Sequence, residues 1–457
     1  MATADRGWAL HRAIWAIALP SMLTNIATAL FGLADLWVIG QLGRADAQAG
    51  VELGAKFMMG LLVVFNFLRT GTIALTAQAS GRNDEAAQAA TLARALGVAG
   101  LIAGLLVSLK PLAVGAGFEL LYARGSVARE AGLYVDIRYW GGPLWLANAA
   151  LTGWLIGRRR VRAVLALEVA ANLLHIAMDA AFVLGLGWGV AGVATATLLS
   201  ETAKTIALIA VAARQPPARE VLAALADRAT WTAAAIGGLF RLNRDLFVRT
   251  MLLTGAILAL TRVGAHQGPT VLAANGILYQ LFILSALLLD GFESAAQVLC
   301  GEAVGANDRA AFARTVRALV LWGLAGGLAV TLVYAAGGDR FAASFSTDPA
   351  VVATTLRYSG WAVLLPLLGV TSYVFDGVFI GATWTRAMLL TMAAAAGLYA
   401  LLLALNPLGN HGLWLAFSLF LVARAAAQAL AMPRLERATF SRPAAAAAAA
   451  AASPTPI

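Results

Sequence analysis

The segment GRNDEAAQAATLARALGVAGLIAGL, residues 81–105, returns in this chain as GANDRAAFARTVRALVLWGLAGGL, residues 305–328. Each copy begins with a polar turn, in which Asn is followed by Asp, and continues into a run rich in alanine, leucine and glycine. The same spacing of about 224 residues places Gly157 on Gly381, in IGRRRVRA and IGATWTRA. Agreement at one spacing in separate places indicates that the chain consists of two homologous halves.

The composition indicates a membrane protein. Of the 457 residues, 61% are hydrophobic and only 12% are charged, and the mean hydropathy is +0.79. Soluble domains carry about 25% charged residues, so we expect an all-α integral membrane protein. Apolar runs of about 20 residues predict transmembrane helices. There are twelve such runs, near residues 10–39, 51–78, 91–114, 131–156, 162–185, 189–212, 233–263, 270–299, 313–336, 351–380, 385–405 and 411–432.

The number of spans predicts how the two halves are related. Each half holds six spans, an even number, so both halves enter the membrane in the same direction. We therefore expect two parallel six-helix lobes related by a pseudo-two-fold axis along the membrane normal. The N-lobe is predicted over 1–212 and the C-lobe over 233–435. The polar segment 213–232 is the predicted cytoplasmic linker, and 436–457 is a low-complexity tail.

The net charge of +10 reflects orientation rather than a nucleic-acid partner. Basic residues gather in short connections on one side of the predicted spans, as in RRRVR at 158–162. The positive-inside rule then places both termini in the cytoplasm. We expect a multi-pass protein of a bacterial cytoplasmic (inner) membrane, with no removable signal peptide.

The chain carries little that points to an enzyme. The four histidines, His11, His175, His266 and His411, lie on separate spans without a paired ligand spacing. The single cysteine, Cys300, excludes an intrachain disulfide. The connections are short and leave no room for a catalytic domain outside the membrane. We therefore expect no enzyme, no metal site and no cofactor beyond a coupling ion.

Three polar residues interrupt the fifth span, in NLLHIAMDAAFVLG at 172–185. An ionisable group is costly in hydrocarbon and persists where it has a partner, a water path or a function. His175 and Asp179 lie one helical turn apart on one face, and Asn172 lies nearly another turn away. His175 either relays protons near neutral pH or forms a hydrogen bond between helices.

The predicted topology places two further polar residues at a similar depth. Asp35 lies about 8 Å below the outer end of the first span, Asp179 about 9 Å and Thr197 about 12 Å. Two carboxylates in one pocket of low dielectric can share a proton or a cation. We predict a coupling-ion site formed by Asp35, Asp179, His175, Thr197 and Asn172. The alternatives are that the carboxylates reach headgroup water, and that Thr197 bonds to its own helix.

The second half contains charged residues of its own. Arg244 and Asp245 open the seventh span, where they either anchor it at the interface or line a cavity. Asp290 and Glu293 lie one turn apart in the eighth span and are predicted to line a cavity. The repeat relates Glu293 to Arg69, and we hypothesise that these opposite charges meet.

Two more residues lead to predictions about movement and position. Pro20 lies inside the first span, where it removes a backbone hydrogen bond and permits a kink. Bending at Pro20 would move Asp35, so we consider it a possible hinge; a kink without gating is the alternative. Asp376 lies near the inner end of the tenth span and is expected at the membrane interface.

The chain resembles the multidrug and toxic compound extrusion (MATE) transporters. The resemblance rests on GLADLWVIGQLG (32–43) and GWGVAGVATATLLSE (187–201) in the first half. LNRDLFVRT (242–250) and LLLDGFESAAQVLCGEAVGAND (287–308) resemble the DNA-damage-inducible protein F branch of that family. The likeness runs from about residue 10 to 435 and covers almost the whole chain.

The resemblance implies antiport, in which protons, or sodium in some members, move inward while an organic and often cationic compound leaves. It also implies an ion site in the N-lobe in which Asp35, Asp179 and Thr197 match the family's polar residues. The position of His175 is usually Asn in this branch. A protonatable imidazole in place of an amide favours protons over sodium.

These observations lead to a hypothesis and two competing ones. The first is a proton-coupled secondary exporter of small, cationic or amphipathic compounds, acting as a monomer in the lipid bilayer. A sodium-coupled exporter and a flippase for lipid-linked precursors, which reuses this architecture, are the alternatives; Arg69, Arg244 and Arg249 keep the flippase open. A membrane-embedded transferase is disfavoured because no catalytic cluster is present.

Overall fold

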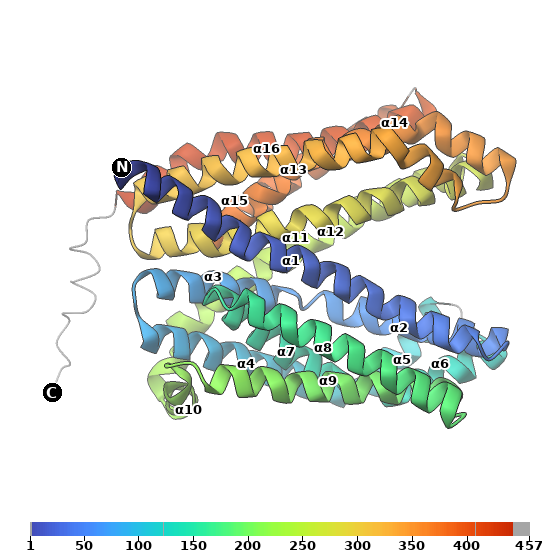
Figure 1. Cartoon of the computed structure of the whole chain (residues 1–457), viewed down its shortest axis with the longest axis horizontal. Helices are drawn as coiled ribbons and strands as arrows, with labels where there is room; N and C mark the ends of the chain where they lie inside the picture. The colour runs from blue at the N-terminus through green and yellow to red at the C-terminus, as the bar shows by residue number, and fades with distance from the viewer. Residues whose placement is uncertain (1, 122, 407, 442–457) are drawn as a thin grey trace. The chain divides into compact units, whose positions relative to one another are not determined.

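The computed structural model of the chain describes residues 2–121, 123–406 and 408–441. Helices make up nearly all of this described part, which contains no β-strand (Figure 1). Ten helices in it are long and apolar enough to cross a membrane. All twelve predicted spans lie on helices. The two that are not among the ten are the first span and the fourth, which is divided into two short helices at Tyr139 and Trp140.

The first half contains nine α-helices and one π-helical segment in the described residues. They are α1 (Ala2–Gly40), α2 (Ala45–Val63), α3 (Phe67–Gly81), α4 (Glu85–Ser108), α5 (Lys110–Leu120), α6 (Gly125–Arg138), α7 (Gly141–Gly157), α8 (Val161–Asp179), η1 (Ala180–Gly185) and α9 (Gly189–Ala213). The segment that follows forms α10 (Ala218–Ala226) and the 3-10 helix η2 (Arg228–Trp231). The second half forms α11 (Ala233–His266), α12 (Pro269–Gly305), α13 (Arg309–Ala343), α14 (Pro349–Gly381), α15 (Thr385–Leu405) and α16 (Gly409–Phe440).

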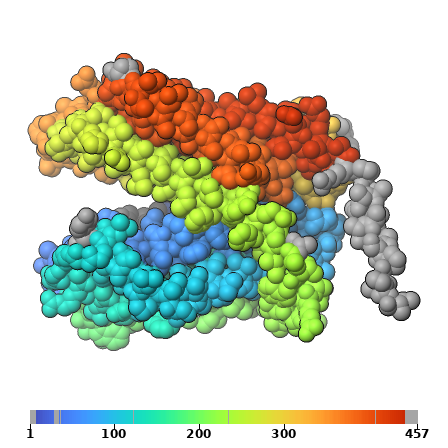
Figure 2. All heavy atoms as spheres, turned by 180° about the vertical axis from the view of Figure 1, so that it is seen from behind, coloured from blue at the N-terminus to red at the C-terminus, as the bar shows by residue number. Residues whose placement is uncertain are grey.

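The chain divides into two compact units. We name them the N-terminal unit, Trp15–Met251, and the C-terminal unit, which combines Met1–Ile14 with Leu252–Ile457. The divisions fall inside α1 and α11. Seen by itself, each unit is a compact body (Figure 2). The lobe boundaries predicted from the sequence stay a prediction.

In the N-terminal unit, two glycines bring α3 and α7 into close contact. A Cβ added at Gly153 would lie 2.5 Å from the backbone oxygen of Arg69, and one at Gly157 would lie 2.8 Å from that of Ile73. These glycines are four residues apart, on one face of α7, so they form a small-residue surface of the kind that lets membrane helices approach closely.

The C-terminal unit contains the same contact between α12 and α14. A Cβ at Gly377 would lie 2.3 Å from the backbone oxygen of Glu293, and one at Gly381 would lie 2.5 Å from that of Gln297. Each of these residues lies about 224 positions after its counterpart in the first half. The repeat seen in the sequence is therefore also a repeat of helix packing.

The repeated polar turns have the same backbone conformation in both halves. Asn83 and Asn307 have φ angles of 53° and 54°, in the left-handed region that Asn tolerates better than most residues. The following residues, Asp84 and Asp308, each accept a hydrogen bond of 2.8 Å from the backbone N–H three residues later. This is the geometry of an N-cap, so the Asn-Asp pair ends one helix and begins the next.

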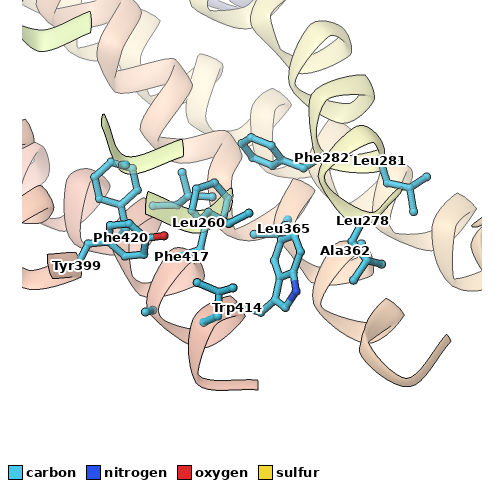
Figure 3. Close-up of a cluster of buried hydrophobic side chains, with 14 of the residues drawn as sticks. Leu260, Leu278, Leu281, Phe282, Ala362, Leu365, Tyr399, Trp414, Phe417 and Phe420 are labelled. Atoms are coloured by element: carbon cyan, nitrogen blue, oxygen red, sulfur yellow. The ribbon is translucent and has the colours of Figure 1, made fainter. Parts of the chain in front are cut away.

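Aromatic and aliphatic side chains form the core of the C-terminal unit (Figure 3). Leu278 and Trp414 are completely buried there, and Phe417 is nearly so. The rings of Phe282 and Phe417 meet edge to face with their centroids 5.2 Å apart, a preferred arrangement for aromatic pairs. This packing holds α12 against α16.

Candidate coupling-ion site

Three ionisable side chains meet inside the N-terminal unit, between α1 and α8. His175 Nε2 lies 2.5 Å from Asp35 Oδ1 and 3.0 Å from Asp179 Oδ2. Asp35 is 4% exposed, and His175 and Asp179 are completely buried. One imidazole nitrogen thus contacts two carboxylates that the sequence places 144 residues apart. The structure brings together three of the five residues that we predicted to form one site.

The local sequence explains why α8 supplies two of these groups. His175 and Asp179 are one turn apart and project from the same face of the helix. Asp179 is the last residue of α8, and the π-helical segment η1 begins at the next residue. A π-helical turn changes the direction of the side chains that follow it and is common at functional sites.

The two remaining members of the predicted site make different contacts. Asn172, one turn before His175, donates a 2.8 Å hydrogen bond from Nδ2 to the backbone oxygen of Ala27 on α1. Thr197 is completely buried on α9 and donates a 2.9 Å hydrogen bond to the backbone oxygen of Val193. The hydroxyl hydrogen of Thr197 therefore bonds to its own helix, which was the alternative considered for this residue.

The distances within this group are those of hydrogen bonds. One ligand atom from each of Asp35, His175 and Asp179 lies within 4.8 Å of the others, so the set is close enough to surround an ion. Ligands about 2.0 Å from a tetrahedral zinc ion lie about 3.3 Å from each other. The 2.5 Å contact between Asp35 and His175 is shorter than that separation and corresponds to a hydrogen bond.

The charged residues predicted for the second half divide between the two units. Arg244 and Asp245 form a 2.8 Å ion pair on the first part of α11, within the N-terminal unit. Asp290 and Glu293 are both partly buried on α12 in the C-terminal unit, and Gln297 donates a 2.9 Å hydrogen bond to Glu293. The predicted meeting of Glu293 with the Arg69 side chain stays a prediction.

Pro20 lies inside α1, which continues on both sides of it from Ala2 to Gly40. Its backbone oxygen accepts a 2.8 Å hydrogen bond from the hydroxyl of Thr24. Side chains of this kind can bond to carbonyls near a proline in a membrane helix. The role of Pro20 as a hinge stays a prediction.

One carboxylate in the C-terminal unit is more deeply buried in the protein than expected. Asp376 was expected at the membrane interface, but it is 1% exposed and forms an ion pair with Arg424. Gln428 donates a 2.8 Å hydrogen bond to the other carboxylate oxygen. Arg424 and Gln428 are four residues apart on α16, so one face of that helix supplies both partners. The sequence contains this spacing, but it does not say which helix lies opposite.

A second charged group in the N-terminal unit was missed. Glu168 on α8 forms a 2.8 Å ion pair with Lys204 on α9. Glu201, one turn before Lys204, accepts a 2.8 Å hydrogen bond from Asn148 on α7. The available signal was the position of Glu168, seven residues before His175 and so on the same face of the fifth span.

The arrangement of helices and buried charges indicates the class of membrane protein. Membrane-spanning helices in two repeated halves, with paired carboxylates buried inside one of them, are typical of secondary transporters.

Comparison with known proteins gives the family. The MatE family model matches residues 20–181 and 246–405, one segment in each half. The chain is 36% identical over 423 residues to DNA damage-inducible protein F of Escherichia coli, covering 90% of each. It is 30% identical over 439 residues to the probable multidrug resistance protein NorM of Bradyrhizobium diazoefficiens, covering 88% of this chain and 89% of the relative.

The fold agrees with the family match. The crystal structure of a MATE protein in its bent conformation superposes with a TM-score of 0.84 at 17% identity, over 94% of this chain and 97% of that one. The chain belongs to the MatE family and is a multi-pass efflux transporter of the MATE type.

Proposed function

We propose that this protein exports small organic compounds, cationic or amphipathic, in exchange for protons that move inward. The observation that carries the proposal is the contact of His175 Nε2 with both Asp35 and Asp179. Two buried carboxylates attract a positive charge. The imidazole that contacts both of them can itself carry a proton. This arrangement favours protons as the coupling ion.

The nature of the exported compound is proposed from the relatives. One relative is described as a probable multidrug resistance protein. A cationic compound is consistent with the buried acidic groups, because a site that binds a proton can bind a cation in its place. Exchange of the two at one acidic site would then couple their opposite movements.

The test is dye transport in proteoliposomes with an imposed pH gradient, with and without sodium. We expect gradient-driven efflux of a fluorescent cationic dye in the wild type, no dependence on sodium, and loss of efflux in Asp35→Asn and Asp179→Asn. Asp136→Asn is the matched control, because this carboxylate is 69% exposed and pairs with Lys110. Full efflux by both buried variants would refute the proposal.

Two other results would change the proposed coupling ion or the proposed substrate. Efflux that requires sodium would keep the site and change the coupling ion. No dye movement under any gradient, together with lipid-linked sugar accumulating on the inner leaflet after gene deletion, would favour a flippase.

We also propose that the protein acts as a monomer in the cytoplasmic membrane of a bacterium, with both termini in the cytoplasm. The proposed orientation rests on the excess of basic residues in the predicted inner connections. Cys300, the one cysteine of the chain, is completely buried, so cysteines introduced near either end can be labelled against a low background. Labelling of either terminus from outside intact spheroplasts would contradict this orientation.

A further inference from the structure

A second group of charged and polar side chains lies in the N-terminal unit and has no part in the proposed ion site. It consists of Glu168 on α8, Glu201 and Lys204 on α9, and Asn148 on α7. Lys204 Nζ lies 2.8 Å from Glu168, and Asn148 Nδ2 donates a 2.8 Å hydrogen bond to Glu201. Glu168 is 9% exposed and Glu201 8%. Such groups are costly within a membrane and call for a function.

The packing of α1 against α8 places this group in line with the ion site. The Asp35–His175 contact and the 3.3 Å hydrogen bond from Thr28 to Glu168 both join residues 140 positions apart. A constant difference means that the two helices run parallel in one register. Seven residues separate the two contacts on each helix, so Glu168 lies about 10 Å along the helix from His175.

Polar groups occupy the interval between the two sites. Because α8 and α9 are antiparallel, the Glu168–Lys204 pair sets their register and brings Asn172 and Ser200 to the level between the two sites. Asn172 is 8% exposed and Ser200 1%. Asn172 bonds to α1 and Ser200 donates to the backbone oxygen of Thr197. The facing sides of α8 and α9 therefore present polar side chains between the two carboxylate groups.

The side chain of Asn148 has a buried oxygen, Oδ1, that can accept a further hydrogen bond. Its side chain is 4% exposed, and its Oδ1 atom is buried without a hydrogen-bond partner among the residues that the structure describes. The Nδ2 atom of the same amide contacts Glu201, so the open acceptor lies beside that carboxylate. A buried acceptor without a partner destabilises the folded state, and a hydrogen bond from a water molecule or a protonated carboxyl group would remove this cost.

The charges around Glu168 and Lys204 suggest how a proton is held. Lys204 is one turn from Glu201 and in contact with Glu168, so two carboxylates share one ammonium group. The other charged groups that act on this cluster are Arg69, Arg138 and His175. When Glu168 is neutral, Lys204 can turn to Glu201 and remain paired.

We propose that Glu168 is a second proton-binding residue, which receives the coupling proton from the Asp35–His175–Asp179 site. The O–H bond at the first site breaks, the proton crosses the path lined by Asn172 and Ser200 through water, and an O–H bond forms on Glu168. Lys204 then moves from Glu168 to Glu201. This inference rests on the proposed proton coupling and adds the direction in which the proton leaves.

The test compares transport with binding in the same variants. In Glu168→Gln we expect proton-driven dye efflux to fall by roughly a hundredfold, the lower range for loss of a positioned proton-transfer group. Equilibrium binding of the dye, and its displacement as the pH falls, should match the wild type, because the first site is intact. Wild-type binding also shows that the variant is folded. Glu52→Gln is the matched control, since Glu52 forms an exposed pair with Lys56 in the same unit.

A double variant separates proton transfer from structural support. Glu168→Gln combined with Lys204→Gln removes both charges, so a pair that only holds the helices together would regain transport. We expect efflux to stay low in the double variant and to recover in part in Glu168→Asp. Wild-type efflux in Glu168→Gln, or full recovery in the double variant, would overturn the inference. A different result would show that the proposed proton coupling itself is wrong. In that case dye binding by Asp35→Asn would keep its dependence on pH.

Discussion

Replacing His175 by Asn tests the reasoning about the ion site directly. Asn is the residue that the resemblance leads one to expect at this position, and it is shorter than His and carries no titratable proton. The substitution leaves Asp35 and Asp179 without the imidazole that contacts both of them. We expect the variant to lose proton-driven efflux and to gain a response to sodium.

The size of the effect follows from the distance between the two carboxylates. Their ligand oxygens lie within 4.8 Å of one another. At an effective dielectric constant of about 20, two like charges at that distance repel by about 3.5 kcal/mol. A cation that binds between them relieves this repulsion, which corresponds to a factor of about 300 in its affinity. A sodium ion would then compete where the imidazole now stands.

The assay is dye efflux from proteoliposomes over a range of sodium concentrations, at fixed pH and under a pH gradient. His266→Asn is the matched control, because His266 is exposed in the last turn of α11. An unchanged pH response in His175→Asn, with no response to sodium, would show that His175 does not determine the coupling ion.

Three further substitutions test a close contact between helices, a buried ion pair and a backbone conformation. Gly377→Ala should lower the free energy of unfolding by about 1–3 kcal/mol, and with it the thermal midpoint, because its Cβ would lie 2.3 Å from a backbone oxygen of α12. Gly360→Ala on the same helix is the control. Its Cβ would meet nothing within 4 Å, so the thermal midpoint should change little. Arg424→Met should lower the free energy of unfolding by about 3–5 kcal/mol and reduce the yield of folded protein, because Asp376 would lose the cation with which it pairs. Adding Asp376→Asn removes the buried charge and should recover the yield. Thr383→Asn should raise the thermal midpoint, because Thr383 has a φ of 58°, which Asn adopts with less strain; a lower midpoint would contradict this.

The positions of the helices, their repetition and one cluster of buried polar residues could be predicted from the sequence alone. A span is recognised from its own apolar residues, and a repeat from the comparison of two segments. Spans and repeats can both be recognised without knowing which helices are neighbours. His175 and Asp179 were found for the same reason, since they lie one turn apart on a single helix. Asp35 was added because topology places it at a similar depth.

Contacts between helices required the tertiary structure. The ion pair of Glu168 with Lys204 and that of Asp376 with Arg424 join different helices. Which residues meet across such an interface depends on the rotation and register of each helix. In the N-terminal unit, residues 140 positions apart meet between α1 and α8, a register that neither helix shows in its own sequence. The sequence by itself determined which polar residues enter the membrane, and the packing of the helices decided which of them became partners.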